Sequence, residues 1–171
     1  MASLTAERLD PLRWIAAPMA ACMGATLLLA APIKLWGLQL PEPVFAMIPA
    51  FAWAVLRPSI LAPLCLLALG LFDDLVWGGR LGLWGLGLLV AYGFLLITRN
   101  MMSGQGRIMV WVWYVAAWSA CMGTAYAFTL MQTGNAPNIL AVAGQWLPTA
   151  LLYPVADRLI ARFEDADPRF R

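Results

Sequence analysis

Apolar stretches separated by short polar turns set the strongest limit on what this chain can fold into. Six of them cover residues 14–31, 44–56, 60–77, 81–98, 108–131 and 139–156. A helix of about 20 apolar residues crosses a bilayer and satisfies its backbone hydrogen bonds internally. The pattern therefore predicts an all-α integral membrane protein, a six-transmembrane-helix bundle in one polytopic domain over residues 1–171.

Two of these segments admit a second interpretation. Segment 44–56 is short for a span and contains Pro49, so it either starts further back, toward Leu38, or is a re-entrant or kinked helix. Segment 14–31 ends in Leu29-Ala30-Ala31, as a cleaved signal peptide does, but its apolar run is longer than a usual signal core.

Hydrophobic residues make up 63% of the chain and charged residues 12%, which lies outside the range of soluble domains.

Basic residues are distributed unequally between the two sides of a six-helix path. One side has only Lys34 and Arg80, and the other has nine arginines: Arg8, Arg13, Arg57, Arg99, Arg107, Arg158, Arg162, Arg169 and Arg171. Because cytoplasmic loops are enriched in Lys and Arg, both termini are predicted to be cytoplasmic, with residues 157–171 as a cytoplasmic tail. The net charge is only +2 and no basic stripe exists, so no nucleic-acid partner is predicted.

The residues that most enzymes need are missing or isolated. The chain has no His, which excludes Ser-His-Asp and Cys-His catalytic arrangements and His-ligated metals. Cys22, Cys65 and Cys121 each lie alone in an apolar segment, so they predict neither a metal site nor a disulfide framework. The Gly78-Gly79-Arg80 run lacks the strand and the Gly-Lys-Ser/Thr ending of a phosphate-binding loop. We therefore predict a protein that is not an enzyme and holds no metal or cofactor.

Asp73 and Asp74 lie near the end of the third apolar segment, where a charge in contact with lipid is costly. Neighbouring residues on a helix point about 100° apart, so we expect one carboxylate to face the bundle and the other the interface. Arg80 and Lys34 are the candidate opposing cations. A proton or cation relay would need further acids within the membrane, and the sequence offers none there. The pair is therefore interpreted as structural, with ion coupling as the alternative.

Glycines follow the acids at helical spacing. Gly78, Gly82 and Gly85 are four and three residues apart, which on a helix forms a groove where a neighbouring backbone approaches closely. Gly79 is assigned to the turn. The candidate structural or partner-binding motif at this outer end comprises Gly70, Asp73, Asp74, Gly78, Arg80, Gly82 and Gly85.

A second candidate set lies at the predicted cytoplasmic end and comprises Arg57, Pro58, Asp157, Arg158 and Arg162. Arg158 and Arg162 are four residues apart, hence on one helix face, and are predicted to contact the phosphates of membrane lipids. An interfacial anchor and a docking site for a cytoplasmic partner both fit this set.

Three stretches of the sequence form a pattern that can be compared with known membrane protein families. They are Phe51-Ala52-Trp53-Ala54-Val55-Leu56-Arg57-Pro58, then Gly70-Leu71 followed by Asp74, Gly78, Leu81 and Gly82, then Leu152-Tyr153-Pro154 running into Asp157-Arg158-Leu159-Ile160-Ala161-Arg162-Phe163. Between about Pro41 and Phe163 the chain resembles the MreD family of rod shape-determining membrane proteins. In this match Asp74 is the family acid. Asp73 stands where the family usually has an apolar residue, and Arg80 stands where a small residue or proline is common.

The resemblance implies a protein of the bacterial inner (cytoplasmic) membrane with six transmembrane helices and cytoplasmic termini. It implies a non-enzymatic scaffold or regulator of cell elongation, hence of rod shape and lateral peptidoglycan synthesis. The partners it implies are MreC and, through it, MreB, RodA and the elongation transpeptidase. The main alternative is the substrate-binding S component of a vitamin (energy-coupling factor) transporter, which is also a six-helix protein of this size. A small enzyme acting on a lipid phosphate is a further alternative.

Overall fold

The computed structural model describes residues 12–30, 43–56, 58–134 and 138–166, and within these ranges it is helical, with no strand. A π-helical turn, Leu12–Ala16, leads into α1, Ala17–Ala30. The helices that follow are α2, Met47–Leu56; α3, Leu61–Val76; α4, Leu83–Met102; α5, Arg107–Thr133; α6, Ile139–Ala150; and α7, Tyr153–Ala166. The predicted all-α fold is confirmed.

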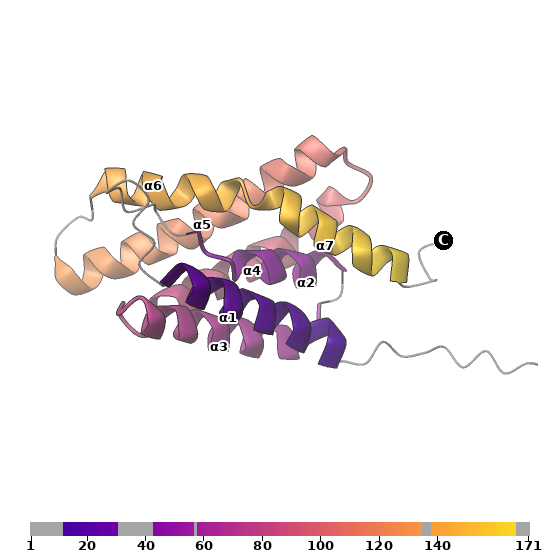
Figure 1. Cartoon of the computed structure of the whole chain (residues 1–171). Coiled ribbons are helices and arrows are strands. Elements are labelled where there is room, and N and C mark those ends of the chain that lie inside the picture. Colours follow the sequence, from indigo (N-terminus) through magenta and orange to yellow (C-terminus); the bar gives the residue numbers. More distant parts are fainter. Residues whose placement is uncertain (1–11, 31–42, 57, 135–137, 167–171) are drawn as a thin grey trace, which may run out of the picture.

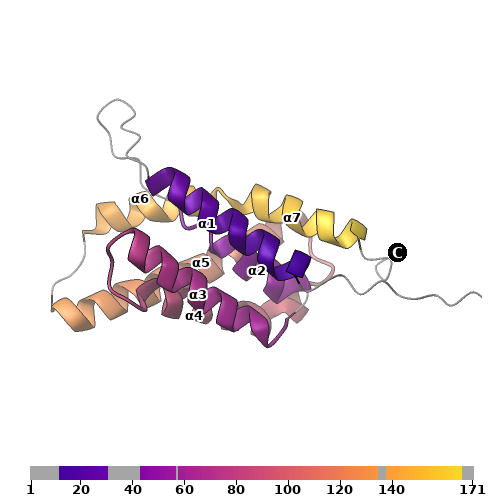
Figure 2. The ribbon, with the colours of Figure 1, turned by 60° about the horizontal axis from the view of Figure 1, so that its bottom comes forward.

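The helices form an elongated bundle (Figure 1, Figure 2). In it α4 packs between α3 and α5, and α2 packs against α4 and α7. The α3–α4 turn and the end of α5 lie at one end of the bundle (Figure 1). The start of α1, the α4–α5 connection and the end of α7 lie at the other end (Figure 1). The first and last helices therefore begin and finish at the same end.

Three helical segments are long and apolar enough to cross a membrane: Leu83–Met102, Arg107–Thr133, and Ile139–Ala161, which comprises α6 and most of α7. Segment Trp14–Ala30 and α2 are apolar but shorter. Helix α3 has 16 residues and contains both carboxylates near its end. Hydropathy predicted the middle residues of these helices correctly, because hydrophobic periodicity and long apolar runs are the main signal of secondary structure in a sequence.

Helix α2 is a short helix buried inside the bundle. Its ten residues rise about 15 Å, half the thickness of a bilayer core. All residues from Met47 to Ala54 are buried. The predicted kink at Pro49 is wrong, because Pro49 lies in the first turn of α2, where its missing N–H breaks no helical bond.

The last apolar segment, predicted as a single span over 139–156, is two helices that meet at Leu151–Leu152. Pro154 lacks the N–H that would bond the carbonyl of Ala150 one helical turn earlier. Trp111 Nε1 on α5 donates to that carbonyl instead, at 3.3 Å. Tyr114 Oη donates to the neighbouring carbonyl of Thr149, at 3.1 Å. Helix α5 thus supplies a donor to the carbonyl left free by Pro154 and a further donor to Thr149, whose carbonyl also accepts from the N–H of Leu152.

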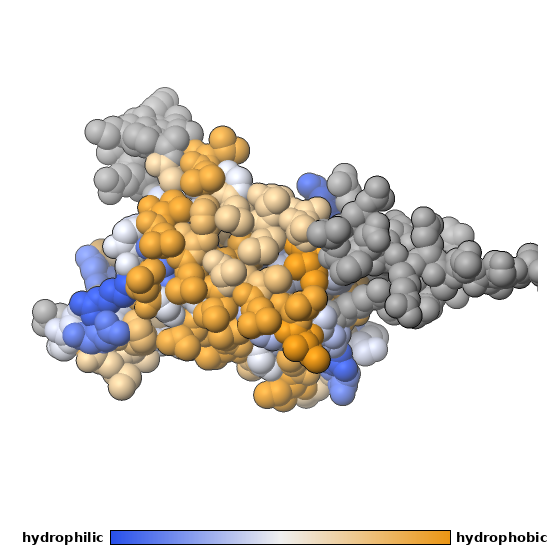
Figure 3. Space-filling view, turned by 90° about the horizontal axis from the view of Figure 1, so that it is seen from below, coloured by the Kyte–Doolittle hydropathy of each residue, from blue (hydrophilic) through white to orange (hydrophobic). Residues whose placement is uncertain are grey.

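One face of the bundle is hydrophobic across its middle, with hydrophilic residues gathered toward the two ends (Figure 3). Exposed leucines on α1 and α3 include Leu28, Leu61, Leu64 and Leu75, whose relative exposures run from 52% to 74%. Monomeric soluble proteins rarely expose contiguous apolar patches of more than a few hundred Å². The surface is therefore of the kind covered by lipid or by other proteins.

Candidate functional site

The carboxylate of Asp74, near the end of α3, caps the start of α4. Its Oδ2 accepts a hydrogen bond from the backbone N–H of Gly82 at 2.7 Å, and its Oδ1 accepts one from the N–H of Trp84 at 3.2 Å. The first N–H groups of a helix have no partner within the helix and carry the positive end of its dipole. Asp74 is 1% exposed, and its bond with Trp84 is buried, while its bond with Gly82 is partly buried. The side chain thus ties the end of one helix to the start of the next.

The backbone of Asp74 organises the turn as well. Its carbonyl accepts from the N–H of Gly79 at 2.9 Å, and this closes the chain after α3. Gly78 and Gly82 have φ values of 62° and 93°, a region that L residues with a side chain seldom adopt. The predicted helical groove of Gly78, Gly82 and Gly85 is therefore wrong, because the first two glycines lie in the turn. Gly79 lies in the turn, as expected.

The close helix approach occurs instead between Gly70 and Gly85. A Cβ added to Gly70 would overlap the backbone N and Cα of Gly85 and lie 2.7 Å from the carbonyl carbon of Trp84. Only glycine fits at this crossing of α3 and α4. Gly70 and Asp74 therefore both fix the hairpin of α3 and α4. Gly70 does so through backbone contact and Asp74 through hydrogen bonds.

Asp73 faces a different helix. Its Oδ1 accepts a hydrogen bond from Thr26 Oγ1 on α1 at 3.2 Å, while its Oδ2 is buried with no hydrogen-bond partner among the described residues. Asp73 is 3% exposed, so the expectation that one of the two carboxylates faces the interface is wrong. Both are buried because α1 covers one side of α3 and the start of α4 covers another.

Arg80 does not bond either carboxylate. Its Nη1 donates to Gln132 Oε1 near the end of α5, at 2.8 Å, and the pair is exposed. The prediction of Arg80 as the opposing cation is therefore wrong, because the turn directs it toward α5. The other candidate, Lys34, lies outside the described residues. Within the described ranges, Asp74 is held by backbone N–H groups rather than by a cation.

The second candidate set lies at the opposite end of the bundle. Asp157 Oδ2 forms an ion pair with Arg107 Nε at 3.3 Å, and Tyr153 Oη donates to the Arg107 carbonyl at 3.3 Å. These contacts hold α7 to the start of α5. Pro58 is exposed between α2 and α3, whereas Arg57 and the side chain of Arg162 lie outside what the structure describes.

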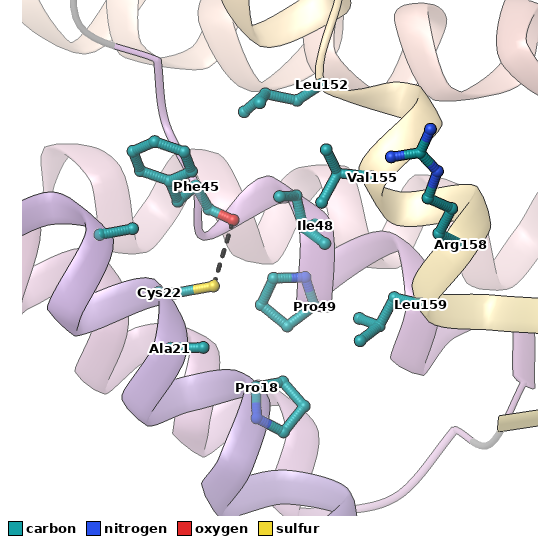
Figure 4. A pocket seen from close by; sticks show the side chains of 11 residues that line it. Pro18, Ala21, Cys22, Phe45, Ile48, Pro49, Leu152, Val155, Arg158 and Leu159 are labelled. Atoms are coloured by element: carbon teal, nitrogen blue, oxygen red, sulfur yellow. Dashed lines mark hydrogen bonds between the residues drawn. The ribbon is translucent and has the colours of Figure 1, made fainter. Parts of the chain in front are cut away.

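A groove opens between α1, α2 and α7, with a cavity volume of about 430 Å³ (Figure 4). Its lining is apolar apart from Cys22 and Arg158. The Cys22 thiol donates to the Phe45 carbonyl at 3.4 Å, so it is already engaged. Arg158, on α7, lines the groove and is exposed.

Sequence reasoning missed the partners that these residues find. Thr26, Gln132 and Arg107 are each more than 45 residues away from the side chain or backbone group that they bond. Thr149 is also absent from the predicted sites, although it is fully buried and its Oγ1 accepts from the N–H of Val44 before α2. Pro154 was the available signal, because a proline lacks the backbone N–H that continues a helix and leaves a carbonyl one turn earlier in need of another partner.

The chemistry of these sites is that of holding helices together. Within the described ranges, no three side chains of His, Cys, Asp or Glu come close enough to hold a metal ion. No family model, curated protein or solved structure matches this chain.

Proposed function

We propose that the chain is a multi-pass protein of the bacterial cytoplasmic membrane, with six membrane-inserted helical segments and both termini in the cytoplasm. The up-and-down arrangement supports this, since α1 begins and α7 finishes at the same end (Figure 1). Arg107 and Arg158 lie at that end, and Arg80 lies in the α3–α4 turn at the other. Such an asymmetry favours the arginine-rich end as cytoplasmic.

Within that membrane the protein acts as a non-enzymatic scaffold of the cell-elongation machinery. The observation that carries the proposal is the α3–α4 hairpin, in which Gly70 and Asp74 of the MreD-like motif fix two helices in one geometry. A motif that serves architecture rather than chemistry is what a scaffold needs. From the third MreD-like stretch, Tyr153 holds α7 to the start of α5, and Pro154 lies next to the junction between α6 and α7.

The mechanism is the presentation of rigid helix faces to other membrane helices. Lipid tails are as apolar as leucine, so helices associate in membranes through close packing and hydrogen bonds rather than through the hydrophobic effect. A hairpin fixed at its turn presents the exposed faces of α3 and α4 at a constant angle. The partners proposed on the resemblance are MreC and, through it, MreB, RodA and the elongation transpeptidase.

Depletion in the source bacterium tests the proposal. We expect depleted cells to lose their rod shape and to stop incorporating fluorescent D-amino acids along the lateral wall. A Gly93→Ala protein should restore both, because Gly93 has nothing within 4 Å of an added Cβ, whereas Gly70→Ala should not. Depleted cells that keep their shape and lateral growth would exclude the function. Tight binding of a B vitamin by the purified protein would favour the transporter component instead.

A further inference from the structure

The groove between α1, α2 and α7 is built to hold something apolar. Pro18 and Ala21 of α1 form one wall, Ile48 and Pro49 of α2 form the floor, and Val155 of α7 lies on the opposite wall (Figure 4). Its volume of about 430 Å³ falls within the range of pockets that bind small ligands. Short side chains on α1 keep the hollow open, since they do not reach across to α7.

A single charge marks one part of this groove. Arg158 lines it, and the adjacent acid, Asp157, is already paired with Arg107 at 3.3 Å. Within the described ranges Arg158 has no ion pair of its own, so its guanidinium is available to an anion from outside the chain. Guanidinium groups bind phosphate oxygens with two parallel hydrogen bonds.

Arg158 lies near the end of the bundle that is cytoplasmic in the proposed orientation. Anionic lipids are concentrated in the cytoplasmic leaflet, where each basic residue near the surface gains about 1 kcal/mol from them. The apolar lining matches an acyl chain, and the one cation matches a headgroup phosphate. We propose that this groove binds one anionic phospholipid, with an acyl chain between α1 and α7 and its phosphate at Arg158. The inference rests on the proposed membrane orientation but not on the proposed role in cell elongation.

Native mass spectrometry of the purified, delipidated chain tests the site. The probes are phosphatidylglycerol and phosphatidylcholine with identical acyl chains, added separately. We expect the wild-type protein to retain phosphatidylglycerol preferentially and Arg158→Gln to reduce that preference about fivefold, as the loss of one surface charge predicts. Arg99→Gln is the matched control, since Arg99 is exposed at the end of α4 and does not line the groove. Equal effects of the two substitutions would overturn the proposal.

A second variant tests the apolar part of the groove. Ala21→Phe fills the space beside Cys22 and should reduce retention of both lipids, whereas unchanged retention would contradict acyl-chain binding at this place. A phosphatidylglycerol with a photoreactive acyl chain locates the bound lipid on the wild-type protein. Its crosslinks should map to α1 and α7. Crosslinks confined to other helices would overturn the assignment.

Discussion

Replacing Asp74 tests whether its carboxylate holds the α3–α4 hairpin. Asp74→Leu removes both acceptors and leaves the N–H groups of Gly82 and Trp84 without them. Net contributions of hydrogen bonds to charged groups are about 1.5–3 kcal/mol each, so we expect the free energy of unfolding to fall by about 3–6 kcal/mol. Asp74→Asn keeps one acceptor oxygen but loses the negative charge at the helix dipole, so its expected loss is about half as large.

The measurement is unfolding of the purified protein in mixed micelles by increasing SDS, followed by circular dichroism. Hydrogen–deuterium exchange of the peptide covering the α3–α4 turn gives a local readout, because the amide protons of Gly82 and Trp84 lose their protection when the acceptor is removed. Both the free energy of unfolding and the protection of the turn are expected to decrease from the wild type to the Asn variant and from the Asn variant to the Leu variant. A Leu variant within about 1 kcal/mol of the wild type, with protection retained at the turn, would refute the capping role.

Three further predictions follow from the same helices. Gly70→Ala should destabilise the protein by about 1–3 kcal/mol or more because its methyl group meets backbone, whereas Gly93→Ala should be neutral or stabilising by up to about 1 kcal/mol in the same SDS titration. Asp73→Val should change stability little, because loss of the hydrogen bond from Thr26 is offset by removal of a buried oxygen that has no hydrogen-bond partner among the described residues. In a cysteine-free background, Gly79→Cys should react with a membrane-impermeant maleimide in intact cells, and Ser103→Cys should react only after permeabilisation.

Each of these predictions has an outcome that contradicts it. Equal stabilities of the two glycine variants would show that α3 and α4 do not cross as closely as described. A clear loss of stability in Asp73→Val would show that the carboxylate contributes more than its single bond to Thr26. Labelling of Ser103→Cys in intact cells would reverse the proposed orientation.

Hydropathy predicted the helical class and the middle of most helices because those features depend only on local composition. Local composition fails at α2, which is as apolar as a span but is buried in the bundle at ten residues. It also misses the turn at Leu151–Leu152, next to Pro154, which separates α6 from α7 within one apolar run.

The glycines show a different limit of sequence reasoning. Spacings of three and four residues fit a helix face, yet Gly78 and Gly82 have positive φ and belong to a turn. The close contact between the two helix backbones is instead between Gly70 and Gly85, on either side of that turn. No local spacing in the sequence indicates it. The same holds for Asp73 and Thr26, because a pair 47 residues apart is formed only when α1 packs on α3.

The buried position of α2 has a consequence for how the protein is made. Helix α2 leaves the ribosome before the two helices that cover it, α4 and α7. The N–H of Val44, just before α2, is bonded to Thr149 near the end of α6, and α7 begins at Tyr153. A nascent chain that ends before Tyr153 therefore leaves one face of α2 uncovered. Helix α2 is therefore fully covered only after α7 has been synthesised.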